Sequence, residues 1–148
     1  LQIMFLFLVG LNFAFAQKQR VLVLSDIEAD PDDAQSLVRF LTYSNQWDIE
    51  GLIATTSIHQ KDWAVVETMH DIVDAYAKVQ PNLLKHERGY PTAAFLKTKI
   101  KKGLEKYGME GVGEGKDSEG SNWLIKVLEK PDNRPLWVCI WGGSNCLA

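Results

Sequence analysis

The sequence predicts an α/β domain with an open, doubly wound, mostly parallel sheet. Three short apolar segments, residues 21–24, 49–56 and 136–141, alternate with segments whose apolar residues recur at helical spacing. The first of them has no polar alternation, as expected of a strand that is buried on both faces. With 148 residues, of which 46% are hydrophobic, the chain can bury one core and is too short for two ordinary domains.

Four helices are expected between these strands, because apolar residues repeat every three to four positions and capping or turn residues stand at the ends of each segment. A strand, a helix and a second strand in succession predict a right-handed crossover and therefore parallel strands. Residues 103–120 contain six glycines and five acidic residues and predict a long loop. The expected helices are residues 31–43, residues 62–79 with Pro81 as the helix breaker, residues 92–102, and residues 121–129 with Ser121 as the cap.

The first sixteen residues predict an export signal. They are almost wholly apolar and end in Ala14-Phe15-Ala16, whose small first and third residues suit a signal-peptidase site. A membrane span needs ~20 apolar residues, and the polar residues 17–20 end this run too early. We therefore expect residues 1–16 to be a signal peptide on a secreted or periplasmic bacterial protein without a stable membrane anchor. Both ends of the chain look cut, so we expect residues 17–148 to be the N-terminal part of a domain truncated at its C-terminus.

The charge of the chain excludes one class of partner. The formal net charge is −3, and 24% of the residues are charged. No basic field is evident that would attract nucleic acid, so no DNA or RNA partner is expected.

Five carboxylates lie within eight residues after the first predicted strand: Asp26, Glu28, Asp30, Asp32 and Asp33. In a parallel sheet this loop lies at the carboxyl end of a strand, where ligands usually bind. A purely structural explanation covers residues 30–33, because an Asp cap, Pro at the first helical position and early carboxylates all favour a helix start. It leaves out Asp26 and Glu28. Gathering these two beside Asp32 and Asp33 would be repulsive unless a cation neutralises them. Carboxylate oxygens without His or Cys favour Ca²⁺, with Mg²⁺ second, over zinc or copper.

The same loop resembles a known family signature. Residues 26–34 are similar to the N-terminal motif of nucleoside hydrolases, D-x-D-P-G-x-D-D-A, with its four acidic positions occupied. Residues 50–56 look like the second strand of that family, and residues 141–148 look like a later loop. A closer resemblance, through residues 32–41 and 113–121, is to the nucleoside-hydrolase-like domain of proteins described as cellulose-binding.

The resemblance implies a fold with Rossmann-type layers and a role for each matching residue. Asp26 and Glu28 would contact the metal and act as the catalytic carboxylates, and Asp33 would bind the metal through both oxygens. Asp32 would hold a sugar hydroxyl, and the backbone carbonyl of Asn145 would complete part of the calcium shell. Two departures stand out, because Glu28 replaces the family's Asp and Ala29-Asp30 replaces its Pro-Gly.

The long glycine-rich loop has two interpretations. It lacks the spacing of a P-loop, since Gly115-Lys116 is followed by Asp117. It is either a plain surface loop or a substrate contact, in which case Glu114 and Asp117 are the best candidates. A phosphatase with an aspartate nucleophile is disfavoured, because its D-x-D-x-T motif would here have Glu28 and Asp30 in place of the second Asp and the Thr.

Two functions follow as expectations. The first is a metal-dependent hydrolase of N-glycosidic or related glycosidic bonds, acting on a small nucleoside or saccharide. The second is a non-catalytic carbohydrate-binding domain, such as a cellulose-binding one, on the same fold.

Overall fold

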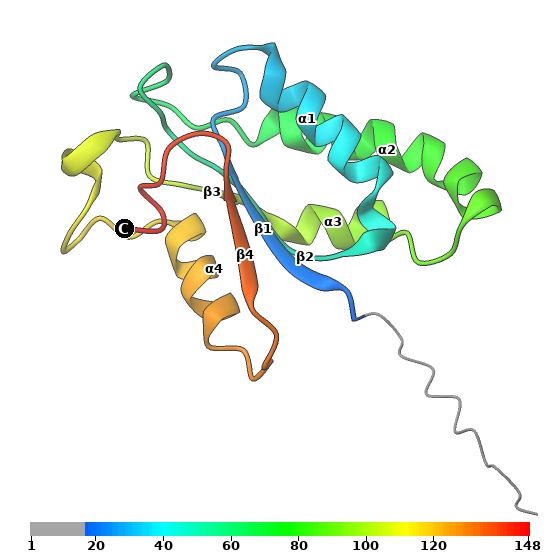
Figure 1. The fold of residues 1–148 in the computed structure, drawn as a ribbon. Coiled ribbons are helices and arrows are strands. Elements are labelled where there is room, and N and C mark those ends of the chain that lie inside the picture. The colour runs from blue at the N-terminus through cyan, green and yellow to red at the C-terminus, as the bar shows by residue number, and fades with distance from the viewer. Residues whose placement is uncertain (1–16) are drawn as a thin grey trace, which may run out of the picture.

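Four parallel strands form the centre of the molecule in this computed structural model, which describes residues 17–148 (Figure 1). Their order across the sheet is β3-β2-β1-β4. The strands are β1 (Gln19–Ser25), β2 (Trp47–Ala54), β3 (Ile100–Lys102) and β4 (Leu136–Ile140). The predicted signal peptide, residues 1–16, lies outside the described residues and stays a prediction.

Helices cover both faces of the sheet, which confirms the doubly wound architecture (Figure 1). Three of them pack on one face and α4 packs alone on the other. The helices are α1 (Pro31–Thr42), α2 (Glu67–His86), α3 (Ala93–Lys99) and α4 (Glu119–Leu128), with 3₁₀ turns η1 (Ser44–Gln46) and η2 (Gly108–Gly111). No helix within residues 17–148 is long and apolar enough to cross a membrane.

The central strand β1 is buried on both faces, as its unbroken apolar run predicts. Val21 and Val23 join the core formed with α1, α2 and α3, whereas Leu22 and Leu24 join the core under α4. All four side chains are at most 6% exposed. At roughly 1.5–3 kcal/mol for each fully buried aliphatic side chain, this strand is a major source of the domain's stability.

Two expected helices end at other residues than predicted. The third was expected to run to Gly103, but α3 ends at Lys99, and residues 100–102 pair with Leu52–Ala54 of β2 as a strand. The second was expected over residues 62–79, with Pro81 as the breaker, but α2 begins at Glu67 and continues through this proline to His86. Pro81 is exposed, and Leu83, beyond it, packs against the larger core. Tertiary burial of the last turn therefore outweighs the local disruption by Pro81.

The start of α4 also differs from the prediction. Ser118 caps this helix by accepting a hydrogen bond from the backbone N–H of Ser121, and the hydroxyl of Ser121 in turn accepts one from the backbone N–H of Ser118. Ser121 is therefore the third residue of a capping box rather than the cap itself.

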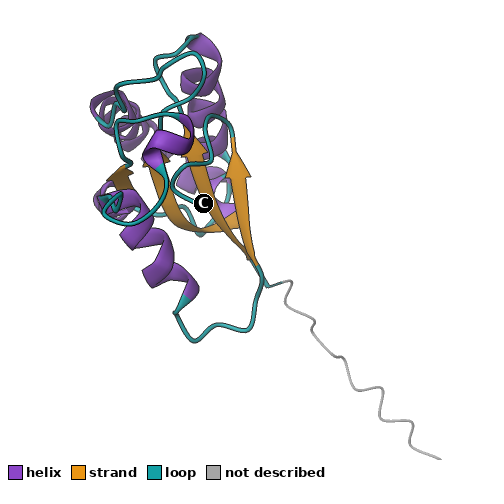
Figure 2. Ribbon diagram, turned by 90° about the vertical axis from the view of Figure 1, so that its left-hand side faces the viewer, coloured by secondary structure: helices purple, strands orange, loops and turns teal. Residues whose placement is uncertain are grey.

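The strand order places a topological switch point beside β1. From β1 the chain leads to β2 and β3 on one side, and later returns to place β4 on the other side. All strands point to the same edge of the sheet, where the long loops gather (Figure 2). In open α/β sheets, ligands bind in the crevice at this carboxyl edge, where the strand order reverses. The loops that follow β1 and β4 are therefore the first place to look for a site.

Candidate functional site

Two carboxylates of the acidic loop come together in a buried position. Asp26 follows β1 directly and is 8% exposed, and Asp33 lies in the first turn of α1 and is 5% exposed. The hydroxyl of Ser25 donates a hydrogen bond to Asp33 Oδ2 at 2.6 Å and accepts one from the backbone N–H of Ile27 at 3.1 Å. Ser25 therefore fixes the loop to the first turn of the helix. The sequence analysis did not single out this residue.

The electrostatics of this pair are unfavourable without a cation. Burial, together with the neighbouring carboxylate of Asp26, raises the pKa of Asp33 to about 6, against the hydrogen bond from Ser25. Among the ion pairs within residues 17–148, none involves Asp26 or Asp33. Buried carboxylates of this kind are typically paired or bound to a metal.

The helix-cap interpretation of the other loop residues is confirmed. Asp30 is the N-cap of α1, and its side chain accepts a hydrogen bond from the backbone N–H of Asp32 at 3.2 Å. Asp32 is exposed, and its own carboxylate accepts from the backbone N–H of Asp33 at 2.8 Å. Asp32 therefore supports the helix start and still presents a carboxylate to solvent at the rim of the buried pair.

Glu28 is not gathered with Asp26 and Asp33. It has a φ of +83°, a left-handed backbone conformation that costs a non-glycine residue roughly 1 kcal/mol or more. Its exposed carboxylate accepts a hydrogen bond from the hydroxyl of Thr68 on α2 at 2.7 Å. Within the described part of the chain, no three His, Cys, Asp or Glu side chains form a group that could hold a metal ion. A metal site there would therefore need oxygen donors besides the clustered carboxylates.

The loop after β4 packs directly on Asp26. The backbone N–H groups of Trp141 and Gly142 both donate to the carbonyl of Leu24, at 2.8 and 3.3 Å. A Cβ atom on Gly142 would lie 2.6 Å from the backbone nitrogen of Asp26 and 2.8 Å from its Cγ. Only glycine allows this approach, so Gly142 belongs to the site although the sequence analysis assigned it no role.

Asn145 holds a neighbouring loop. Its side-chain amide donates to the carbonyl of Gly108 at 2.7 Å and so fixes η2 at the same edge of the sheet. The group that the resemblance assigns to the metal is the backbone carbonyl of Asn145, which is separate from this contact.

Two buried polar atoms near the loop have no hydrogen-bond partner among residues 17–148: Thr55 Oγ1 and Gln60 Oε1. Thr55 follows β2 and donates its backbone N–H to the carbonyl of Ser25 at 2.7 Å. Gln60 donates its side-chain amide to the carbonyl of Ile27 at 3.3 Å. An unsatisfied buried polar atom costs roughly 1–3 kcal/mol, so both atoms are suited to a bound water or ligand. In the sequence, the polar residues 55–57 at the end of the second predicted strand were the signal that buried polar groups lie beside the acidic loop.

Glu114 and Asp117 are both exposed, in the segment between η2 and α4. Within residues 17–148, no hydrogen bond or ion pair connects either side chain to the acidic loop. Their assignment to substrate stays a prediction.

Comparisons with known proteins identify the family of the chain. The family model described as "Cellulose-binding Sde182, nucleoside hydrolase-like domain" matches residues 20–148. This match covers most of the chain. The chain belongs to the Sde182 nucleoside hydrolase-like domain family.

A solved structure supports the same placement. It is described as a nucleoside hydrolase-related hypothetical protein from Saccharophagus degradans that is associated with carbohydrate metabolism. It is 44% identical to this nucleoside hydrolase-like chain, with a TM-score of 0.85. The match covers 88% of this chain and 32% of the other, so the chain spans about a third of that protein's length. Among curated proteins, none matches the chain.

Proposed function

We propose that the acidic loop binds Ca²⁺ and that the full-length protein hydrolyses N-glycosidic or related glycosidic bonds of a small nucleoside or saccharide. The observation that carries the proposal is the buried pair Asp26 and Asp33 at the switch point of the sheet, without a basic partner among the described residues. The donor atoms at hand are hard oxygens, which suit calcium better than softer metals.

The residues of the loop divide into metal ligands and substrate contacts. Asp33, fixed by Ser25, is positioned to bind the ion through its carboxylate, and Asp26 is buried beside it. Calcium would contribute binding of sugar hydroxyls and a lowered pKa of a bound water. Asp32, exposed at the rim, is free to accept a hydrogen bond from a sugar hydroxyl.

The proton of the attacking water needs an acceptor within hydrogen-bond reach. Asp26 is the candidate that its position favours, because it is held against Gly142 at the base of the loop. An oxocarbenium-like transition state would be stabilised by the negative charge of the loop. Glu28, the other candidate, is engaged by Thr68 and would have to leave that hydrogen bond to reach a water beside Asp26.

A second candidate function is favoured by the position of Glu28. If this carboxylate remains bound to Thr68, the domain would keep its fold and could still bind the metal. It would, however, lack one of the two catalytic carboxylates that the family resemblance assigns. The protein would then be a non-catalytic carbohydrate-binding domain, which agrees with the description of its family as cellulose-binding.

One experiment separates the two functions. The full-length mature protein would be assayed for ribose release from nucleosides and for reducing-sugar release from cello-oligosaccharides, with calcium and with a chelator. We expect calcium-dependent turnover that Asp26→Asn lowers by roughly 10²–10⁴-fold. Asp30→Asn is the matched control, because Asn caps a helix as well as Asp and Asp30 is not placed in the site.

The outcomes are distinct. Calcium-dependent turnover that is lost only in Asp26→Asn supports the hydrolase. Saccharide binding by calorimetry without turnover favours the carbohydrate-binding function. Equal losses in Asp26→Asn and Asp30→Asn would mean that the loop acts only as a helix start.

A further inference from the structure

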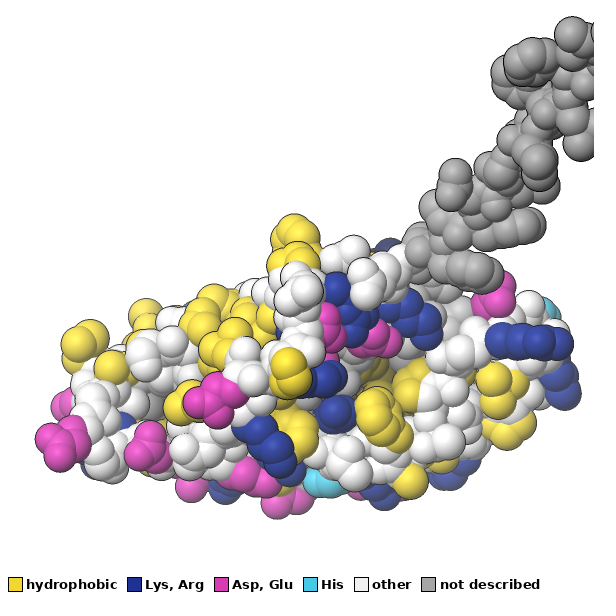
Figure 3. Space-filling model, turned by 90° about the horizontal axis from the view of Figure 1, so that it is seen from below, with side chains coloured by type: hydrophobic (Ala, Val, Ile, Leu, Met, Phe, Trp, Pro, Cys, Tyr) yellow, Lys and Arg dark blue, Asp and Glu magenta, His cyan; other side chains and the backbone are white. Residues whose placement is uncertain are grey.

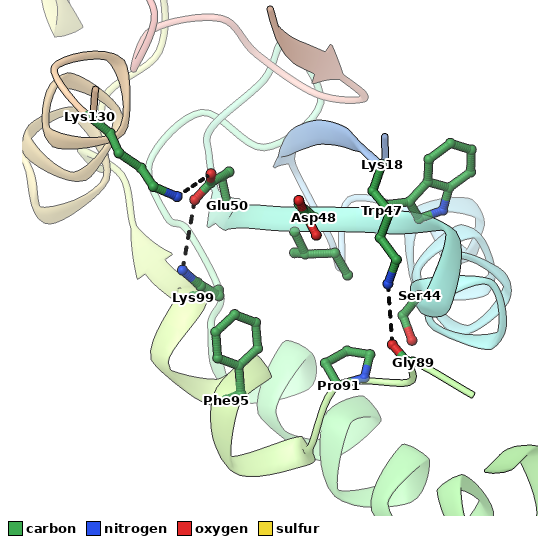
Figure 4. A pocket seen from close by; sticks show the side chains of 11 residues that line it. Lys18, Ser44, Trp47, Asp48, Glu50, Gly89, Pro91, Phe95, Lys99 and Lys130 are labelled. Carbon is green, nitrogen blue, oxygen red and sulfur yellow. Dashed lines mark hydrogen bonds and ion pairs between the residues drawn. The ribbon is translucent and has the colours of Figure 1, made fainter. Parts of the chain in front are cut away.

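A second cavity lies at the opposite, amino-terminal edge of the sheet. It has a volume of about 300 Å³ and is bounded by residues before β1, the start of β2, the segment that precedes α3, and the ends of α3 and α4 (Figure 4). Since β1 has seven residues, this edge is roughly 20 Å from the acidic loop. Viewed from this side, basic and acidic side chains lie next to a hollow with hydrophobic side chains (Figure 3).

Lysines reach this cavity from three separate parts of the chain: Lys18, Lys99 and Lys130. The buried Glu50 accepts hydrogen bonds from Arg20 Nε and Lys130 Nζ, both at 2.9 Å. The other acid in the wall, Asp48, is paired with Arg134. The two acids of the cavity are therefore already neutralised by Arg20, Lys130 and Arg134.

Two ammonium groups remain with little compensation. Lys99 Nζ lies 3.9 Å from Glu50 Oε2, a long contact to a carboxylate that already has two cationic partners. Among residues 17–148, the hydrogen-bond partner of Lys18 Nζ is the carbonyl of Gly89, at a long distance of 3.5 Å. Figure 4 shows both ammonium groups at the cavity, on opposite sides of it. This positive excess occurs in a chain whose net charge is −3.

Lys99 is also surrounded by other lysines. Its side chain is 14% exposed, and its ammonium lies 4.8 Å from the ring centre of Phe95 and 5.4 Å from that of Trp123. Lys101 and Lys126 lie over the same indole, at 4.9 and 5.3 Å. Burial lowers the pKa of Lys99, and the neighbouring lysines lower it further, against the influence of Glu50. An anion beside Lys99 would relieve this repulsion.

The uncharged walls indicate what kind of anion would fit. Phe95 and Pro91 line the lower side of the cavity in Figure 4, and Trp47 lines another side. Aromatic walls favour the apolar face of a ring. An inorganic anion alone would use only the lysines.

We propose that this cavity binds a small anionic sugar, a mono- or disaccharide whose carboxylate or phosphate pairs with Lys99, with Lys18 facing it across the cavity. The sugar ring packs on Phe95 and Pro91. A neighbouring hollow of about 370 Å³ beside Trp123 shares Glu50, Lys99 and Lys130 with the cavity and has room for a second sugar unit. The choice of a sugar over other organic anions rests on the proposed function, whereas the need for an anion rests on the lysines.

A purely structural role explains only some of the charged and aromatic residues around this cavity. Arg20 also donates to the carbonyl of Val127 at 2.8 Å, and the indole of Trp123 donates to the carbonyl of Glu50 at 2.8 Å. These contacts fix α4 to β1 and β2 and account for Arg20, Glu50 and Trp123. They give no reason for Lys18 and Lys99 to converge on one cavity.

Calorimetry on the full-length mature protein tests the proposal, with glucuronate, glucose 6-phosphate, glucose and inorganic phosphate as probes. We expect binding of at least one of the two anionic sugars, and weaker binding of inorganic phosphate and of glucose. Lys99→Gln should weaken binding by about tenfold or more, because a charge-assisted hydrogen bond is lost. Lys97→Gln is the matched control on the same helix, because Lys97 pairs with the exposed Asp74 at 2.6 Å, away from the cavity.

Each possible result either supports or overturns the proposed anionic-sugar site. Lys18→Gln, at the edge of the cavity, provides a second variant if Lys99→Gln fails to fold, and it too should weaken binding. No binding of either anionic sugar, or equal binding by wild type, Lys18→Gln and Lys99→Gln, would overturn the proposal. If inorganic phosphate binds as tightly as both sugars, the cavity binds anions without recognising the sugar ring, and the sugar part of the proposal is overturned. Asp26→Asn should leave this binding intact even though it lowers the proposed hydrolysis by roughly 10²–10⁴-fold, so the two proposals can fail separately.

Discussion

Replacing Asp33 with Asn tests whether the acidic loop holds unfavourable charge for the sake of a ligand. The pKa of Asp33 in the folded, metal-free protein is about 6, compared with 3.8 for a free side chain. A difference of about two units corresponds to about 3 kcal/mol of destabilisation when the carboxylate is ionised. Asn retains the size of the side chain and an oxygen that can accept the hydrogen bond from Ser25, so the variant removes mainly the charge.

The sign of the pH dependence follows from linkage. Because the folded pKa is raised, the folded state holds a proton that the unfolded state has lost between pH 4 and 6. The stability of the metal-free wild type should therefore fall as the pH rises through this window and then level off above it. Asp33→Asn should be equal to wild type near pH 4 and more stable by up to about 3 kcal/mol at pH 8.

Urea denaturation of the full-length protein with a chelator, at pH 4 and pH 8, measures this difference. Calcium at about 100 times its Kd should then raise the stability of wild type by about 2.7 kcal/mol and leave Asp33→Asn unchanged. If Asp33→Asn is no more stable than wild type at pH 8, Asp33 is not strained by burial, and the case for a cation partner loses its physical basis.

Three further substitutions test individual contacts. Glu28→Asp releases the hydrogen bond with Thr68 and suits the positive φ better, so nucleosidase kcat/KM should rise if the protein is a hydrolase; a fall would contradict this. Gly142→Ala places a Cβ 2.6 Å from the backbone of Asp26 and should cost about 1–3 kcal/mol in urea denaturation, whereas an unchanged midpoint would show that the loop is not held there. Pro81→Ala restores a backbone donor at an exposed helical position and should stabilise the fold by up to about 3 kcal/mol, which is measured as a higher thermal midpoint. A lower midpoint would mean that Pro81 supports α2.

The elements that could be predicted from the sequence are those whose signals are local. The unbroken apolar run Val21 to Leu24 predicted a strand buried on both faces, and the structure buries each of these residues. The sequence Asp30-Pro31 predicted the start of α1, because capping depends only on neighbouring residues.

The elements that could not be predicted depend on partners far along the chain. β3 has three residues, two of them lysines, and forms a strand because its backbone pairs with the edge of β2. α2 continues beyond Pro81 because Leu83 reaches the core, which no local pattern shows. Such tertiary contacts override propensity.

The candidate sites show the same division. Sequence spacing brought Asp26 and Asp33 into one loop, but the contact between Glu28 and Thr68 depends on where α2 packs. The cavity at the amino edge could not be predicted, because Lys18, Lys99 and Lys130 are widely separated in the chain.

Calcium binding is the central claim, and titration calorimetry on the full-length mature protein tests it most directly. We expect wild type to bind one ion at the acidic loop and Asp33→Ala to bind none there, because Asp33 is the carboxylate that Ser25 fixes in the buried pair. Asp32→Ala is the matched control from the adjacent position, where the exposed carboxylate is assigned to a sugar hydroxyl, and it should still bind calcium. If Asp33→Ala binds calcium as tightly as wild type, the acidic loop is a helix start and not a metal site.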